Sequence, residues 1–217
     1  MKTPASNCPL CPRLAAFRAE NRAAFPDWHN APVESFGPIS ARLLVVGLAP
    51  GLRGANRTAR PFTGDFAGDL LYPTLADHGF TFGAFAARAD ARADDGLEMV
   101  DCRIANAVRC VPPENRPTTS EFKACLPFLT AEMAAMPRLA VILALGKGAH
   151  DQVLRATGAL PLSARRFGHG AEHDLPNGLI LADSYHCSRY NTNTGRLTPA
   201  MFDSVVAAVR ARLGDAG

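Results

Sequence analysis

Residues 42–51, RLLVVGLAPG, join a run of branched apolar residues to a turn rich in glycine and proline. A short apolar run that ends in such a turn indicates a buried strand, and a strand buried on both faces is typical of a parallel sheet. Three further runs of this kind lie at residues 99–108, 139–145 and 179–182. The four runs therefore predict four buried strands.

Helical patterns, with apolar residues at spacings of three and four, separate these runs. They cover residues 9–25, 69–78, 120–136, 148–157 and 199–213. The alternation of strands and helices indicates an α/β fold with a mainly parallel sheet, in which ligands bind beyond the carboxyl ends of the strands. Because the chain has no internal repeat and no low-complexity linker, we expect a single domain over residues 1–217.

The composition is that of a globular protein. The 217 residues are 47% hydrophobic and 20% charged, which excludes collagen, a coiled coil and a wholly disordered chain. No stretch approaches the roughly 20 apolar residues of a membrane span, and the first residues lack the apolar core of an export signal. We therefore expect a cytoplasmic protein with no membrane partner.

Arginine carries almost all of the positive charge. The net charge of +3 is too small to indicate a nucleic-acid partner by itself. However, Arg53, Arg57 and Arg60 lie in a glycine-rich segment that has no acidic residue between positions 51 and 63. The planar guanidinium group suits phosphate, so this segment predicts a basic face, although a general bias toward arginine explains the pattern equally well.

The six cysteines indicate a metal site, because a reducing compartment disfavours disulfides. Cys8 and Cys11 form a Cys-x-x-Cys pair, and Cys110 and Cys125 lie far downstream. Four thiolates bind zinc or hold a [4Fe–4S] cluster, and the open spacing of the second pair favours the cluster. Cys102 lies in an apolar run and is expected to be a small buried hydrophobe.

Three blocks of sequence, interleaved with these cysteines, resemble the iron–sulfur uracil-DNA glycosylases, and family 5 (type B) more closely than family 4. The blocks are GLAPG at 47–51 with NRTARPFTGD at 56–65, NAVRCVPPENRPT at 106–118, and HCSRYNTNTGRLT at 186–198. The resemblance spans almost the whole chain. It implies a three-layer α/β/α fold with a central four-stranded, mainly parallel sheet. It also implies a structural [4Fe–4S] cluster on Cys8, Cys11, Cys110 and Cys125 that ties in the N-terminal helix.

The same resemblance implies an activity, the removal of uracil from DNA to leave an abasic site. Such an enzyme must take the nucleotide out of the stack, hold its base in a flat pocket and bind the base edge. Phe62 matches the family aromatic residue that stacks on the base, and Gly47 and Ala49 lie in the block that forms the pocket with it. Asn106 matches the asparagine that binds the base edge through a donor and an acceptor. His186 matches the histidine that donates to the base oxygen where negative charge develops.

Several groups are candidates to position the attacking water. Family 4 enzymes carry an acid in the first block where this chain has Ala49, and the alanine is the type B pattern. Asn56 and Asp65 lie close by in the sequence, although Asp65 is also suited to cap the following helix and Asn56 to stabilise its own loop. A highly dissociative transition state needs little help from a base, so the missing acid does not refute glycosylase activity.

Two loops are expected to bind the DNA backbone, and small polar and basic residues of the second are suited to meet phosphates beside the flipped nucleotide. The candidates are Arg53, Arg57, Ser188, Arg189, Tyr190 and Arg196. Of these, Arg189 and Tyr190 are the candidates for the wedge that fills the gap in the stack.

Cys187 stands where the family usually has proline, so this loop is expected to be more flexible. A nucleophilic role for Cys187 is disfavoured, because adjacent residues of an extended segment point apart.

One alternative from another class of function remains, a metal-stabilised module that binds DNA without catalysis. Such a module would not need Phe62, Asn106 and His186 together. A uracil-DNA cross-linking relative is disfavoured because no histidine lies between residues 49 and 62, and Gly146-Lys147-Gly148 is an incomplete P-loop. We expect a monomer that acts on DNA containing uracil or other deaminated bases, with the range of bases left open.

Overall fold

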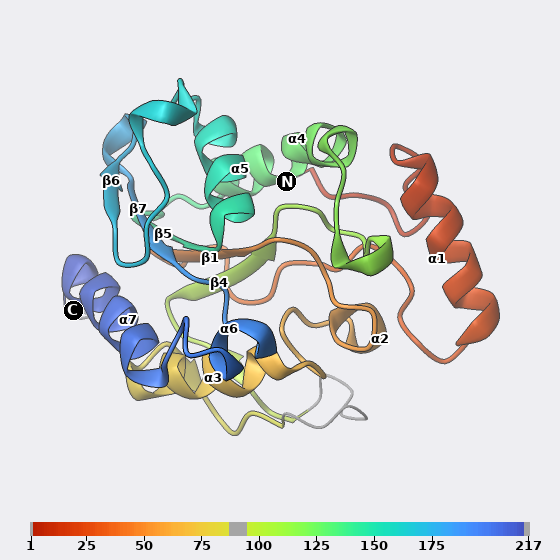
Figure 1. Cartoon of the computed structure of the whole chain (residues 1–217), viewed down its shortest axis with the longest axis horizontal. Helices are drawn as coiled ribbons and strands as arrows, with labels where there is room; N and C mark the ends of the chain where they lie inside the picture. Colours follow the sequence, from red (N-terminus) through yellow and green to blue (C-terminus); the bar gives the residue numbers. More distant parts are fainter. Residues whose placement is uncertain (1, 87–94, 215–217) are drawn as a thin grey trace.

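The structure is a computed structural model that describes residues 2–86 and 95–214. Its centre is a five-stranded sheet in the order β4-β1-β5-β7-β6 (Figure 1). The strands are β1 (Leu43–Gly47), β4 (Cys102–Asn106), β5 (Val141–Leu145), β6 (Glu172–Asp174) and β7 (Ile180–Ser184). The parallel strands are β1, β4, β5 and β7, which correspond to the four predicted strands, whereas β6 pairs antiparallel with β7. The α/β fold is confirmed, and the sheet has one strand more than expected.

Helices cover both faces of the sheet and make the three layers (Figure 1). One face carries α3 (Phe66–Asp77) and α7 (Pro199–Leu213), and the other carries α4 (Thr119–Ala135) and α5 (Lys147–Thr157). The N-terminal helix α1 (Pro12–Ala24) packs its Leu14 against Val108 and Phe128 in a third, smaller core. The described residues also form two short helices, α2 (Ala55–Thr58) and α6 (Arg189–Asn193), and a hairpin of β2 (Thr81–Phe82) with β3 (Glu98–Met99). Three single-turn 3₁₀ helices lie at Pro113–Asn115, Leu162–Ala164 and Pro176–Gly178.

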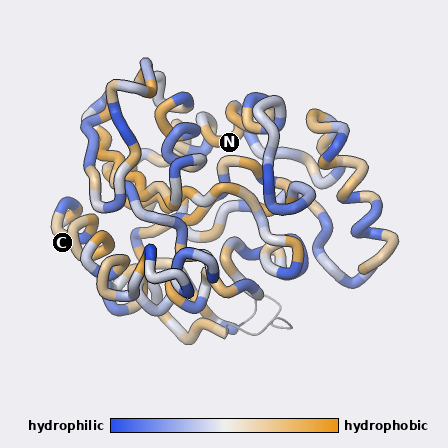
Figure 2. Tube along the Cα trace, in the orientation of Figure 1, coloured by the Kyte–Doolittle hydropathy of each residue, from blue (hydrophilic) through white to orange (hydrophobic). Residues whose placement is uncertain are grey.

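The strands divide their side chains between the two faces. Leu43 and Val45 belong to the core under α3 and α7, whereas Leu44 and Val46 belong to the core under α4 and α5. Figure 2 accordingly shows mainly hydrophobic residues at the centre of the molecule, where these strands lie. Each large apolar side chain that is buried in this way stabilises the fold by roughly 1.5–3 kcal/mol. The two-sided burial explains why these strands read as continuous apolar runs.

Side-chain caps fix the starts of three helices, α3, α4 and α7. Thr118 and Glu121 form a reciprocal capping box at the start of α4, and the Thr198 hydroxyl accepts a hydrogen bond from the Met201 amide at the start of α7. The Asp65 carboxylate accepts from the Ala67 amide and begins α3 directly after the first motif block. Within the described residues, none of the helices combines the length and the apolar character that a bilayer span requires.

Candidate active site

A cavity of about 340 Å³ opens beyond the carboxyl ends of β1 and β4. This volume lies within the usual range for small-molecule sites, and its place is the one that a parallel sheet predicts. Residues from all three motif blocks line it. The sequence-predicted residues among them are Ala49, Phe62, Asp65, Asn106, His186, Ser188 and Arg189.

The floor of the cavity depends on a glycine at the end of β1. Gly47 pairs in register with Asn106 at the end of β4. A Cβ atom at position 47 would lie 2.5 Å from Oδ1 of Asn106 and 2.7 Å from the Phe62 ring. These distances are too short for any side chain, so glycine allows the amide and the aromatic ring to approach each other.

Phe62 forms one wall of the cavity in an unusual backbone conformation. Its φ is +54°, a value that costs a residue with a large side chain about 1–3 kcal/mol. The side chain is 6% exposed, and its ring centroid lies 5.9 Å from that of His186. Strain of this kind persists only where neighbouring groups enforce it.

Asn106 is 3% exposed and lines the cavity from β4. Within the described residues, its carboxamide group has no hydrogen-bond partner, and it is not among the polar groups that are sealed from solvent without one. An amide that faces a cavity in this way is available to a ligand. The site therefore offers one donor and one acceptor, side by side, to a planar ligand.

His186 follows β7 and faces Phe62 across the cavity. Burial lowers the pKa of His186 to about 4, so the imidazole is neutral near pH 7 and keeps one N–H to donate. The Asn191 side chain donates to the His186 carbonyl over 2.8 Å and ties the residue to α6. Its ring makes no hydrogen bond to any other described residue, so the ring nitrogens are available to a ligand.

Asp65 is the acidic residue in the wall of the cavity. Its Oδ1 caps α3, while Oδ2 would lie only 2.5 Å from a Cβ at Gly54, so glycine makes room for the carboxylate. Burial raises the pKa of Asp65 above its ordinary value. Ala49 also lines the cavity and contributes no polar side-chain atom.

Asn56 lies elsewhere. It is 1% exposed, and its side-chain amide donates to Oδ1 of Asn30 over 2.9 Å. It does not line the cavity, unlike its neighbour Ala55. Its place favours the alternative role that the sequence allowed, stabilisation of its own loop.

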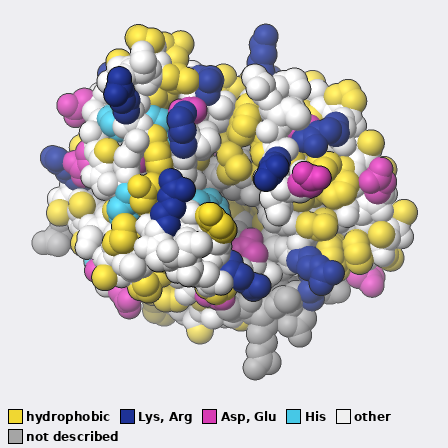
Figure 3. Space-filling model, in the orientation of Figure 1, with side chains coloured by type: hydrophobic (Ala, Val, Ile, Leu, Met, Phe, Trp, Pro, Cys, Tyr) yellow, Lys and Arg dark blue, Asp and Glu magenta, His cyan; other side chains and the backbone are white. Residues whose placement is uncertain are grey.

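Basic side chains surround the hollow at the middle of the face shown in Figure 3. Arg53 is exposed, and the guanidinium of Arg57 lies 5.8 Å from the centre of the Trp28 ring. Arg189, at the start of α6, lies 5.3 Å from the ring of Phe66, at the edge of the cavity.

The rest of the second loop is exposed to different degrees. Tyr190 is 72% exposed in α6, beside Arg189. Arg196 lies with its guanidinium 4.6 Å from the centre of the Tyr185 ring, whereas Ser188 caps α6 at the cavity wall.

The structure brings together the four cysteines of the predicted metal site. Cys8 and Cys11 precede α1, and together with Cys110 and Cys125 they line one small cavity. Burial, together with the neighbouring Cys125, raises the pKa of Cys11 to about 11. The described residues contain one group of three potential ligands within 4.8 Å of one another, and it includes none of these cysteines. No three of the four sulfur atoms therefore lie within 4.8 Å of one another.

Two buried arginines flank these sulfur atoms. Arg18 Nη1 lies 3.6 Å from Cys110 Sγ, and the Arg109 amide donates to Cys125 Sγ over 3.4 Å. Nε of Arg109 is buried without a hydrogen-bond partner in the described structure. The Arg109 guanidinium is paired with Glu132 over 2.7 Å, so Arg18 supplies the cationic group that contacts a cysteine sulfur and favours negative charge there.

The other two cysteines are buried in the main core. Cys102 and Cys187 are both 0% exposed, and burial raises the pKa of Cys187 to about 12. The structure thus agrees with the expectation that Cys102 acts as a small hydrophobe. Cys187 points into the core while His186 faces the cavity, so it is not placed to act as a nucleophile.

Sequence reasoning missed three features near the cavity. Asn115 lines it with φ of +56°, a conformation that asparagine tolerates and that its turn-rich block could have suggested. Phe66 lines it as well. A buried network in which Asp183 lies 2.8 Å from His150 and 3.1 Å from His173 holds β7 just before His186, and these residues are distant in sequence.

Comparisons with known proteins agree with this geometry. The profile of the family described as "Uracil DNA glycosylase superfamily" matches residues 34–210. A Type-5 uracil-DNA glycosylase of Thermus thermophilus is 43% identical over 213 residues, which cover 95% of this chain and 94% of that protein. Type-5 uracil-DNA glycosylases of Mycobacterium leprae (43%; 92% and 89% covered) and Pyrobaculum aerophilum (37%; 97% and 90%) are also similar. All residues that line the cavity lie inside the matched region. The match to the family profile and to these relatives shows that the chain belongs to the uracil DNA glycosylase superfamily.

Proposed function

We propose that the chain is a monofunctional uracil-DNA glycosylase that hydrolyses the N-glycosidic bond of a flipped uracil and leaves an abasic site, the first step of base excision repair. The observation that carries the proposal is the convergence of Phe62, Asn106 and His186 on one cavity. The relatives of similar length are named for the same activity. We further propose that it works as a single-domain monomer in the cytoplasm.

Each of the three residues has a task that its chemistry suits. The Phe62 ring stacks on the flipped base, and the Asn106 amide binds O4 and N3–H of uracil. Departure of the base places negative charge on O2, and the neutral His186 imidazole donates a hydrogen bond there. A neutral donor does not lose its proton to the leaving base, so it stabilises the anion throughout bond cleavage.

The water that attacks the sugar needs a group that positions it, but it needs little help from a base when the transition state is dissociative. Because Ala49 offers no base, we assign Asp65 the role of positioning this water, since it is the acidic residue in the cavity wall. A carboxylate there also favours the positive charge that develops on the sugar. The residues proposed to bind the DNA backbone are Arg53, Arg57, Ser188, Arg189, Tyr190 and Arg196. Tyr190 is exposed and follows Arg189, which lines the cavity, so Tyr190 is proposed as the wedge.

Cys8, Cys11, Cys110 and Cys125 are proposed to hold a [4Fe–4S] cluster. Tetrahedral zinc with bonds of about 2.3 Å would bring all four sulfur atoms to roughly 3.8 Å from one another, whereas no three of them lie within 4.8 Å of one another here. The Arg18 guanidinium supplies positive charge, and the Arg109 backbone amide a hydrogen bond, beside a cluster that is negative with four thiolates. The cluster would supply cross-links between α1 and the segment 110–125, with no redox step in base removal.

Excision from a labelled oligonucleotide tests the function. The strand contains one uracil, is used single-stranded and paired opposite guanine, and is treated with alkali after incubation. We expect cleavage at the uracil position only after alkali, which identifies a monofunctional glycosylase. Cleavage before alkali would contradict the monofunctional assignment. Binding without cleavage would favour the non-catalytic DNA-binding module, and the same format with hypoxanthine or xanthine defines the range of bases.

The pH dependence of excision tests the role of His186. A lowered pKa means that the imidazole gains its second proton only as the pH falls toward about 4. The single-turnover rate constant should therefore show no inflection near pH 6.5, where an ordinary histidine titrates. An inflection near 6.5 that disappears in His186→Gln would contradict the assignment of a neutral donor.

A further inference from the structure

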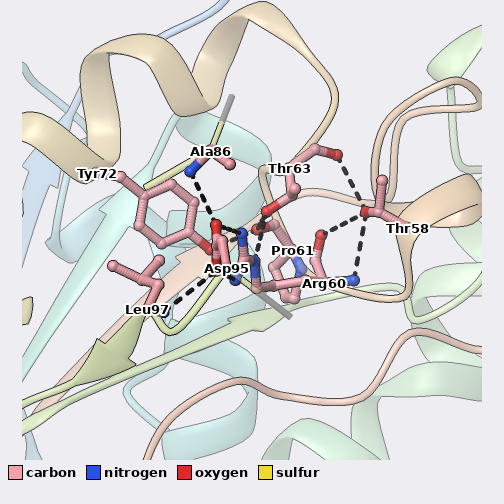
Figure 4. Close-up of polar contacts among 8 residues, drawn as sticks. All are labelled: Thr58, Arg60, Pro61, Thr63, Tyr72, Ala86, Asp95 and Leu97. Carbon is pink, nitrogen blue, oxygen red and sulfur yellow. Dashed lines mark hydrogen bonds and ion pairs between the residues drawn. The ribbon is translucent and has the colours of Figure 1, made fainter. Parts of the chain in front are cut away.

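The left-handed backbone conformation of Phe62 must be held by its neighbours, and the residues around it form a network of hydrogen bonds (Figure 4). The Tyr72 hydroxyl donates to the Pro61 carbonyl over 2.6 Å, and Nε of Arg60 donates to the Thr63 hydroxyl over 2.8 Å. The Thr58 hydroxyl lies 3.2 Å from the Thr63 carbonyl. Residues on both sides of Phe62 are thus held by buried hydrogen bonds.

Arg60 connects this loop to a segment far along the chain. Its Nη1 and Nη2 each lie 2.7 Å from one carboxylate oxygen of Asp95, a bidentate pair with both side chains buried. The Asp95 carboxylate also accepts from the amides of Ala86 and Leu97 (Figure 4). The Arg60 guanidinium holds the pKa of Asp95 well below its usual range, so the pair is charged at every working pH.

Such a pair is a poor way to gain stability. Removing two charges from water costs about as much as their attraction returns, and apolar residues of similar size often serve as well. The pair instead fixes geometry, because two parallel hydrogen bonds to one carboxylate allow the Arg60 guanidinium a single orientation. Phe36, Tyr72 and Phe85 surround the guanidinium with ring centres 5.3, 5.8 and 5.7 Å away, which fixes it further.

We infer that Arg60 and Asp95 are positioning residues for base binding, which hold the Phe62 ring at the angle needed to stack on the flipped base. Neither residue lines the cavity, so both act through Phe62. The inference rests on the proposed glycosylase activity. It extends the base-binding site to Asp95, which lies 35 residues from Arg60 in the sequence.

A double-mutant cycle tests the inference. Arg60→Met should lower the single-turnover excision rate constant by about 10-fold or more, because misplacing a binding group costs this much. In a Phe62→Leu background, which no longer offers an aromatic face, Arg60→Met should lower the rate less than about 2-fold. The affinity for DNA with a tetrahydrofuran abasic analogue, which has no base to stack, should be unchanged by Arg60→Met.

Arg42→Met is the matched control. Arg42 pairs with Asp101 over 2.6 Å at the opposite end of β1, so its loss should leave excision unchanged in both backgrounds. If circular dichroism shows that Arg60→Met does not fold, Asp95→Asn replaces it in the cycle, and the same changes in rate constant and DNA affinity are expected. Equal losses of rate in both backgrounds, or no loss in either, would overturn the positioning role. Absence of excision by the unmodified chain would instead overturn the proposed function and this inference with it.

Discussion

Replacing His186 with alanine should lower the single-turnover rate constant for uracil excision by about 10²–10³-fold, the usual cost of losing one donor to a developing oxyanion. His186 faces Phe62 across the cavity and is the proposed donor. Its ring makes no hydrogen bond to another described residue, so the fold does not depend on such a bond. The expected loss is therefore confined to the chemical step. It is measured with enzyme in excess over a uracil-containing duplex.

His78→Ala is the matched control for this experiment. His78 lies at the end of α3, where Nε2 is 2.7 Å from Asp203 Oδ1 at the surface, far from the cavity. Its excision rate should equal that of the unmodified protein. Affinity for a duplex with a non-cleavable 2′-fluoro-deoxyuridine should be similar in both variants. An unchanged excision rate in His186→Ala would remove this residue from the mechanism.

Replacing Cys110 with serine should remove the cluster and loosen the N-terminal helix. Cys110 packs with Leu14 of α1 and with Cys125 and Phe128 of α4, beside Arg18, so its loss removes both a link between these helices and a sulfur partner of a buried cation. We expect loss of the broad absorption near roughly 400 nm and of acid-labile sulfide. The free energy of unfolding should fall by about 4 kcal/mol, which lowers the melting temperature by about 10 °C.

Cys102→Ala separates this effect from the loss of any buried cysteine. Cys102 is 0% exposed in the main core and lies outside the group of four. Its alanine variant should keep the full iron and sulfide content with a small loss of stability. Zinc in place of iron in the unmodified protein, purified without oxygen, would contradict the assignment of a cluster.

The sheet was largely predictable because its four parallel strands are buried on both faces. Continuous apolar sequence is the direct result of that burial, so the runs at β1, β4, β5 and β7 stood out. The strand β6 could not be found in this way. Its residues Glu172, His173 and Asp174 lie at the sheet edge, where no apolar pattern is required.

The cavity was predictable for a related reason. Parallel strands end at one edge, so residues that follow them, such as Asn106 and His186, must meet. Long-range partners could not be predicted, because no local pattern links Arg60 to Asp95 or His150 to Asp183. The left-handed backbone of Phe62 was hidden too, since aromatic residues rarely adopt it and its enforcing contacts are tertiary.

The docking of α1 also sets an order of events during synthesis of the chain. Leu14 packs against Val108 and Phe128, which follow it by about a hundred residues. At roughly 5–20 residues per second, the helix leaves the ribosome about 5–20 s before these partners exist. Throughout that interval Cys8 and Cys11 are reachable by chaperones and by any carrier that delivers a metal. The helix α1 therefore cannot dock until synthesis has passed Phe128.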